Sequence, residues 1–119
     1  TSCSEVLIFD IETILDPEPR YVRLTGFNLP EDVFISKDKL FVADTCFNRV
    51  LIWNTIPKNG VEEPDVVLGQ DSLEPWLPPK YTRNGLFWPG GVWYDGYFLW
   101  IGEFKFSNRI LRYSPVATP

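Results

Sequence analysis

A hairpin that occurs more than once constrains this chain more than any other feature. Its central copy, KLFVADTCFNRVLIWN from Lys39 to Asn54, predicts two strands at Leu40–Ala43 and Val50–Trp53. Both strands are rich in β-branched and aromatic residues, which favour a pleated and largely buried surface. The second half of the hairpin recurs upstream as SEVLIFD, from Ser4 to Asp10, and the whole hairpin recurs downstream as YFLWIGEFKFSNRILRYS, from Tyr97 to Ser114.

The connections between these strands repeat as well. A polar, proline-containing stretch follows the first two copies, as DIETILDPEPR after Phe9 and as NTIPKNGVEEPD after Trp53. A short strand closed by glycine comes next, at Tyr21–Leu24 and at Val66–Leu68. No stretch of about 10–15 residues between the strands shows helical periodicity, so βαβ units are not expected. The repeating unit therefore has four strands and no helix.

The spacing of the repeat predicts the architecture. Val6 and Val50 occupy the same place in successive copies and lie 44 positions apart. A period above about 40 residues with four short strands is typical of a β-propeller, in which small sheets stack around a central channel. A β-sandwich is the alternative, but it has no reason to repeat its sequence at this spacing. We expect an all-β fold of antiparallel four-stranded propeller blades over residues 1–119, with an incomplete ring in one chain.

Two segments resemble the NHL repeats of six-bladed or similar propellers. They are LFVADTCFNRVLIWNTIPKNGVEEPDVVLGQ, from Leu40 to Gln70, and WPGGVWYDGYFLWIGEFKFSNRILRYS, from Trp88 to Ser114. The runs ADTCFNRVLIWN and DVVLGQ carry the resemblance most clearly. It implies the third and outer strands of one blade at residues 5–26, one full blade at residues 29–69, and the first three strands of the next blade at residues 88–114.

The sequence departs from the NHL pattern in two places. Ser4-Glu5 stands where the family has Asn-Arg, and Gly102-Glu103 stands where it has Ala-Asp. The implied total of nine strands also cannot close a ring of roughly four to eight blades with four strands each. We therefore expect either a piece of a larger propeller or a unit that closes one with other copies of the chain. The start Thr-Ser-Cys and the absence of Met also indicate a processed product or part of something longer.

Two cysteines allow at most one disulfide. Cys3 and Cys46 lie near the same turn of successive repeats. Such turns are normally more than about 7 Å apart, too far for a bridge, so we expect two separate thiols. Neither cysteine belongs to a C-x-x-C pair, so zinc binding and covalent haem attachment are not indicated.

Charge and composition narrow the range of functions that the chain can have. A net charge of −5, from 11 basic and 16 acidic residues, disfavours a nucleic-acid partner. No apolar run approaches the roughly 20 residues of a membrane span. The chain has no His, which removes the usual general acid–base group and any His-ligated metal site. We therefore expect no enzyme activity in this chain, no metal and no cofactor.

A polar set in the hairpin turn recurs in the last hairpin. A catalytic interpretation would make Asp44 a reacting carboxylate and Arg49 an anion clamp. Recurrence favours a structural role instead, since Asp and Asn side chains bond the backbone amides of tight turns and Arg pairs with carboxylates. The predicted structural turn motif comprises Asp44, Asn48 and Arg49, repeated as Glu103, Asn108 and Arg109.

Aromatic residues at turns and links are the better candidates for partner binding. Such segments lie on the rims of a propeller, where ligands and partners dock. Trp76 and Tyr81 also have a plainer interpretation, in which both fold back and pin the link. The predicted partner-binding residues are Phe47, Phe104 and Phe106 in hairpin turns and Trp76 and Tyr81 in the long link. The tryptophans predicted to be core residues are Trp53, Trp88, Trp93 and Trp100.

Three functions remain open. The first is a non-catalytic recognition scaffold that binds a protein or small ligand on the propeller rim. The second is part of a propeller enzyme whose metal and His ligands lie outside this chain. The third is a structural module that closes a propeller with its remaining blades or with other copies. The resemblance is to repeats often found in exported bacterial proteins, which favours an extracytoplasmic location.

Overall fold

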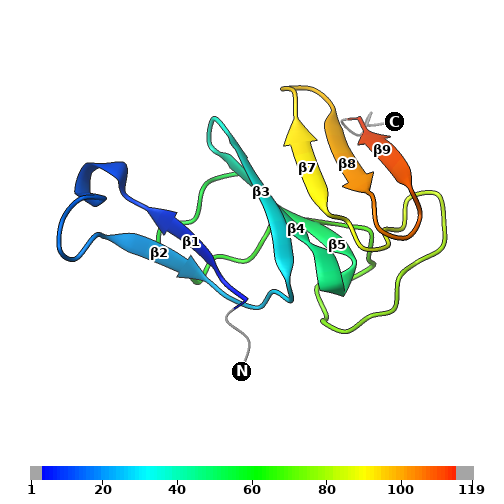
Figure 1. Ribbon diagram of the computed structural model, residues 1–119, viewed down its shortest axis with the longest axis horizontal. Coiled ribbons are helices and arrows are strands. Elements are labelled where there is room, and N and C mark those ends of the chain that lie inside the picture. The colour runs from blue at the N-terminus through cyan, green and yellow to red at the C-terminus, as the bar shows by residue number, and fades with distance from the viewer. Residues whose placement is uncertain (1–3, 115–119) are drawn as a thin grey trace.

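The computed structural model describes residues 4–114 and is all-β (Figure 1). Within these residues, nine strands form three antiparallel sheets, and the helical elements are two single 3-10 turns, η1 (Ile11–Thr13) and η2 (Thr45–Phe47). The antiparallel all-β expectation is confirmed. The first sheet pairs β1 (Val6–Phe9) with β2 (Tyr21–Leu24); the second has the order β3 (Pro30–Ser36), β4 (Lys39–Asp44), β5 (Arg49–Trp53), β6 (Val66–Leu68); the third has the order β7 (Gly91–Tyr94), β8 (Leu99–Glu103), β9 (Arg109–Tyr113).

The second sheet lies between the other two and is covered on both faces (Figure 1). Successive side chains of a strand point to opposite faces. In β4, Leu40 and Val42 face the first sheet, and Phe41 and Ala43 face the third. Because neither face meets solvent, every one of these positions is apolar. This explains why β4 and β5 are continuous hydrophobic runs in the sequence and do not alternate with polar residues.

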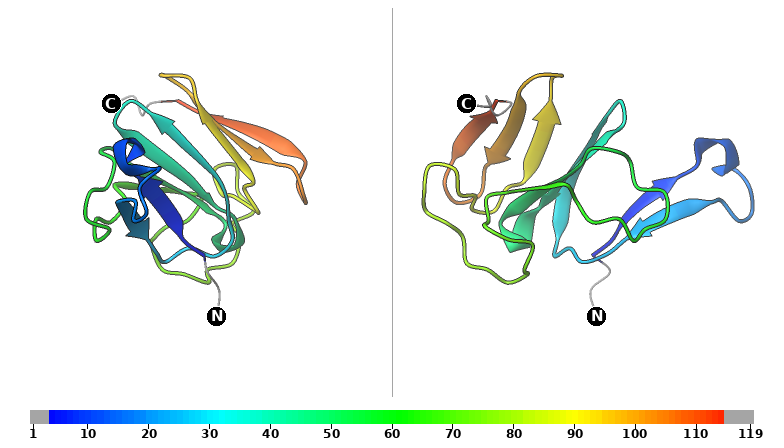
Figure 2. Two further views of the ribbon diagram at one scale, coloured as in Figure 1. Left: turned by 60° about the vertical axis from the view of Figure 1, so that its left-hand side comes forward. Right: turned by 180° about the vertical axis from the view of Figure 1, so that it is seen from behind.

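Two hydrophobic clusters hold the three sheets together. The turned views in Figure 2 show the sheets following one another in chain order. Each cluster joins one pair of neighbours. The first consists of Val6, Leu24, Phe27, Leu40, Val42, Leu51 and Trp53, and the second of Phe41, Ala43, Val50, Leu86, Val92, Leu99 and Ile101.

The β7–β8 turn illustrates how local sequence fixes a hairpin. Gly96 has φ +100°, a left-handed conformation that favours glycine. The Asp95 carboxylate accepts hydrogen bonds from the N–H groups of Tyr97 and Phe98 at 2.9 and 2.7 Å. It also accepts one from the indole N–H of Trp100 at 3.1 Å. Asp95-Gly96 therefore forms the tight turn that joins β7 to β8.

Only one of the four tryptophans predicted to lie in the core belongs to a hydrophobic cluster of the described residues. Trp53 is 3% exposed and lies in the cluster between the first and second sheets. Trp88 and Trp100 are half-buried. Trp93 is 53% exposed, so the prediction for it was wrong. Its side chain lies on the face of the third sheet opposite the second cluster, and within residues 4–114 no further sheet covers that face.

Two further sequence expectations concern the cysteines and membrane-spanning segments. Cys46 is half-buried and unbridged in the described structure, and Cys3 lies outside the described residues. Among residues 4–114 no helix has the length and apolar character needed to cross a membrane.

Candidate functional site

A buried ion pair stands at the centre of the hairpin turn between β4 and β5. The Nε of Arg49 donates to Oδ2 of Asp44 at 2.8 Å, and the two side chains are 3% and 0% exposed. The remaining donors of Arg49 reach the carbonyl oxygens of Leu73 and Gly26, at 2.7 and 3.0 Å. Oδ1 of Asp44 accepts the N–H of Asn28 at 2.8 Å. This pair therefore ties the second sheet to the links before β3 and after β6.

The last hairpin repeats this arrangement with Glu in place of Asp. Arg109 donates through Nε to the Glu103 carboxylate and through Nη2 to the Gly85 carbonyl at 2.8 Å. Glu103 also accepts the N–H of Phe87 at 2.7 Å and the hydroxyl of Ser107 at 2.6 Å. The correspondence with Asp44 and Arg49 is close, because in both sheets the carboxylate takes an N–H of the preceding link and the arginine takes a glycine carbonyl there.

The asparagine of the motif joins one sheet to the next. Asn48 has φ 56° and ψ 47°, a left-handed conformation that Asn tolerates better than most residues. Its Oδ1 accepts the N–H of Trp88 at 2.9 Å, in the link that leads into β7. Asn108 has the corresponding left-handed φ of 51°.

Ser4 makes the equivalent bond between the first and second sheets. Its hydroxyl accepts the N–H of Leu29 at 3.2 Å, and both Leu29 and Trp88 have a positive φ. The sequence showed Ser4 only as a departure from Asn. The alignment of SEVLIFD with NRVLIWN was the signal that could have assigned Ser4 the role of Asn48.

The polar groups of the two ion pairs are hydrogen-bonded within the fold. Within residues 4–114, no buried side-chain nitrogen or oxygen lacks a hydrogen-bond partner. Asp44 has no room for a substrate, since its two oxygens are held by Asn28 and Arg49 and the residue is 0% exposed. The geometry fits a structural turn motif and leaves no free carboxylate for general acid–base chemistry here.

The two buried carboxylates have opposite pKa shifts. Burial raises the pKa of Asp44 above its ordinary value, although the hydrogen bonds from Asn28 and Arg49 oppose the shift. Burial also acts to raise the pKa of Glu103, but hydrogen bonds from Arg109, Ser107 and Phe87 outweigh it, so this pKa lies below its ordinary value. Two features accompany this difference: Glu103 accepts hydrogen bonds from more donors, and its surroundings are less deeply buried, since the Arg109 side chain is 37% exposed and that of Arg49 is 3% exposed.

The lowered pKa of Glu103 predicts part of the acid sensitivity of the fold. A carboxylate whose folded pKa is depressed stabilises the fold above its unfolded pKa, here about 4.5, and loses this contribution as the pH falls through the folded pKa. We expect Glu103→Gln to flatten the fall in free energy of unfolding below pH 4.5, measured by urea denaturation at a series of pH values. Glu74→Gln, at an exposed residue, controls for the loss of one charge. If the free energy of unfolding of Glu103→Gln fell with pH as steeply as that of the wild type, Glu103 would not contribute to the acid sensitivity.

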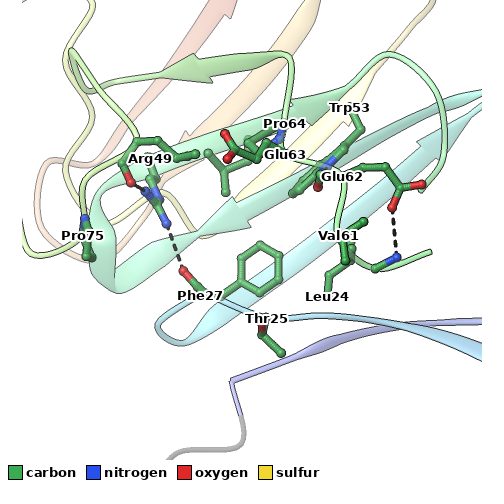
Figure 3. Close-up of a pocket in the computed structure, with 14 residues that line it drawn as sticks. Leu24, Thr25, Phe27, Arg49, Trp53, Val61, Glu62, Glu63, Pro64 and Pro75 are labelled. Carbon is green, nitrogen blue, oxygen red and sulfur yellow. Dashed lines mark hydrogen bonds between the residues drawn. The ribbon is translucent and has the colours of Figure 1, made fainter. Parts of the chain in front are cut away.

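A pocket of about 330 Å³ opens between the first and second sheets (Figure 3). Three polar side chains of its lining, those of Arg49, Trp53 and Glu62, already have partners within the chain. Arg49 lies at one end with its bonds to Gly26 and Leu73, and the indole N–H of Trp53 donates to the Glu62 carbonyl at 3.0 Å. The Glu62 carboxylate accepts backbone N–H groups of its own loop, including that of Gly60 at 2.9 Å. The pocket can hold a small apolar group, and the exposed side chain of Glu63 forms part of its wall.

Metal ligands do not gather anywhere in the described part of the chain. No group of three or more Cys, Asp or Glu side chains within residues 4–114 could hold a metal ion. The sequence itself contains no His.

The predicted partner-binding aromatics fall into separate groups. Phe47 is 6% exposed, so its predicted place on the surface was wrong. The Trp76 ring contacts it edge-on, with centroids 5.0 Å apart, and the Arg49 guanidinium lies over the Phe47 ring, 5.1 Å from its centroid. Trp76 itself is 75% exposed, so it both pins the link and presents a surface. Phe104 is exposed and its ring lies over Gly102 and Gly91, which have no Cβ to obstruct it.

Tyr81 and Phe106 are brought together around Phe87. The Phe87 and Phe106 rings stack with an interplanar angle of 8° and a centroid distance of 5.0 Å. Tyr81 meets Phe87 edge-on at 5.7 Å, and Trp88 meets Phe106 edge-on at 5.6 Å. Nζ of Lys105 lies 4.7 Å from the Trp88 ring, within cation–π range. We call Tyr81, Phe87, Trp88, Lys105 and Phe106 the aromatic cluster.

The aromatic cluster is an exposed feature built from two distant parts of the chain. Tyr81 is 80% exposed and Phe106 50% exposed, although each has an aromatic neighbour that fixes its ring. Such anchored and partly exposed rings are favoured contacts at protein interfaces.

A comparison of the chain with protein-family models, with curated proteins and with solved structures finds no match.

Proposed function

We propose that this chain is a non-catalytic recognition scaffold of the NHL β-propeller type, which binds a protein, peptide or small ligand through the aromatic cluster. The exposure of fixed aromatic rings carries the proposal: Tyr81 and Phe106 are 80% and 50% exposed while Phe87 holds both in place. Rings that are already ordered lose little conformational entropy when a partner binds.

The stacking of sheets supports the propeller part of the proposal. Hydrophobic clusters join each sheet to the next, and a side chain of one sheet accepts an N–H just before the next sheet begins. Ser4 does this for Leu29 and Asn48 does it for Trp88. A repeated relation between neighbouring four-stranded units is the principle on which propellers are built.

The chemistry of the described residues supports a non-catalytic role. The ion pairs Asp44–Arg49 and Glu103–Arg109 are committed to backbone groups of the links, so neither pair offers a free acid or a free base. Recognition through apolar and aromatic contacts needs neither. The positive charge of Lys105 beside Trp88 favours partners with an acidic group near their aromatic or apolar contact.

Selection from a displayed library of random peptides would test this proposal. We expect peptides enriched on the full chain to bind it and to lose about tenfold or more in affinity to the double variant Tyr81→Ala/Phe106→Ala, since removing hot-spot aromatics costs about 2 kcal/mol or more. Binding of labelled peptides would be measured by fluorescence anisotropy.

A matched double variant separates recognition from general loss of aromatic surface. Tyr21 and Tyr97 are 46% and 59% exposed and lie outside the aromatic cluster, so Tyr21→Ala/Tyr97→Ala should bind the selected peptides as the wild type does. Failure to enrich any peptide, or equal loss in both double variants, would refute the role of the aromatic cluster.

A further inference from the structure

The pocket between the first and second sheets is enclosed by four separate segments of the chain. Residues 24–27 at the end of β2 and in the link after it form one wall, and Leu51 and Trp53 of β5 form another. Residues 60–64 of the β5–β6 loop and Leu73 and Pro75 of the long link complete it. All four walls therefore come from residues 24–75.

The walls are held in place by contacts within the chain. Arg49 donates to the carbonyls of Gly26 and Leu73 and so ties the link after β2 to the long link. Gly60 lies so close to β2 that a Cβ there would be 2.6 Å from the carbonyl oxygen of Arg23. The indole N–H of Trp53 holds the same loop through the Glu62 carbonyl at 3.0 Å. The pocket is thus formed in advance, so a ligand does not have to order its walls.

The charged side chains that line the pocket are one arginine and two glutamates, Arg49, Glu62 and Glu63. Arg49 is neutralised by Asp44 at 2.8 Å. The backbone N–H of Lys58, with two further N–H groups of the loop, holds the pKa of Glu62 below its ordinary value, so this carboxylate is ionised at neutral pH. The pocket therefore has an excess of negative charge.

Glu63 is the carboxylate of this wall that the fold leaves available. Its side chain is exposed, and among residues 4–114 it forms no ion pair. The rings of Phe27 and Trp53 also line the pocket and meet edge-on with centroids 6.2 Å apart. Aromatic rings attract cations as well as apolar groups. A ligand with an apolar body and a positive charge is therefore the one that this lining fits.

We propose that this pocket binds a small primary amine with an aromatic or branched aliphatic body. The body packs against the apolar wall that includes Phe27 and Leu51, and the ammonium group donates to the Glu63 carboxylate (Figure 3). The volume of about 330 Å³ lies at the lower end of the range for small-molecule sites, which suits one ring or one branched chain. No residue of the aromatic cluster lines the pocket, so the site does not depend on the function proposed for that cluster.

Three probes with the same ring test the site and its charge preference. They are phenethylamine, which is a cation, phenethyl alcohol, which is neutral, and hydrocinnamate, which is an anion. In proton–nitrogen correlation spectra of the full chain, the amine should shift the Trp53 indole N–H and the Gly26 amide saturably. We expect the amine to bind about threefold tighter than the alcohol, the gain of an exposed ion pair, and hydrocinnamate to bind more weakly than both.

Two variants assign the preference to Glu63. Glu63→Gln should remove the advantage of the amine over the alcohol and leave binding of the alcohol unchanged. Glu18→Gln, at an exposed residue outside the pocket, should keep the advantage. An advantage that persists in Glu63→Gln would overturn the proposal, as would equal affinities of the three probes for the wild type. Shifts confined to the aromatic cluster, or no saturable shift with any probe, would also overturn it.

Discussion

Replacing Arg49 with methionine should lower the free energy of unfolding by about 3 kcal/mol, a large share of the stability of a domain of this size. The change leaves Asp44, which is 0% exposed, without its counter-charge. It also removes the donors to the Gly26 and Leu73 carbonyls, which lie in the links on either side of the second sheet. Urea denaturation followed by tryptophan fluorescence would measure the loss.

An exposed ion pair in the first sheet provides the matched control for this change. Arg20 pairs with Asp10, but the Arg20 side chain is 71% exposed. Solvent screening leaves such a pair about 0–1 kcal/mol, so Arg20→Met should cost far less than Arg49→Met. In the double variant Asp44→Asn/Arg49→Met the buried charge is gone, and part of the stability should return. Equal losses in the two single variants would contradict the role given to Arg49.

Phe41→Ala should also destabilise the fold, by about 3–5 kcal/mol. Phe41 is 2% exposed and lies in the cluster that joins the second and third sheets. Its ring stacks on Tyr94 at a centroid distance of 4.9 Å, so its removal leaves a cavity between the two sheets. The same urea titration would report the loss.

The same substitution on an exposed strand gives the comparison. Phe9 in β1 is 43% exposed and contacts Tyr21, so Phe9→Ala should cost about 1 kcal/mol. If the two substitutions had similar effects, the second and third sheets would not share a core in solution.

The strands could be predicted because burial on both faces leaves a strong sequence signal. The expected strands at Leu40–Ala43 and Val50–Trp53 lie within β4 (Lys39–Asp44) and β5 (Arg49–Trp53). The first strand of the blade expected at residues 29–69 has a weaker signal, because the residues of β3 (Pro30–Ser36) are exposed or only partly buried. Its outer residues are only partly buried, so composition gave no boundary there.

The exposure of individual aromatic residues could not be predicted, because it depends on which face has a neighbour. Phe41 and Trp100 hold equivalent places in their hairpins by the alignment of Asp44 with Glu103. Phe41 is buried by the third sheet, whereas Trp100 is half-buried and Trp93 beside it is 53% exposed. Phe47 was predicted to lie on the surface and is buried, because Trp76 in the long link packs against its ring. Only long-range packing decides these cases.

The hydrogen bonds between sheets are made at the ends of the links. The length of a link can therefore vary without changing these bonds. Five residues separate β2 from β3 and 22 separate β6 from β7, yet Ser4 and Asn48 make the same kind of bond before β3 and β7. Doubling a flexible loop costs only about 0.6 kcal/mol in closure entropy. The exposed stretch around Trp76 is therefore a natural place for insertion of a reporter or a second domain, since the sheets are held in place by contacts on either side of it.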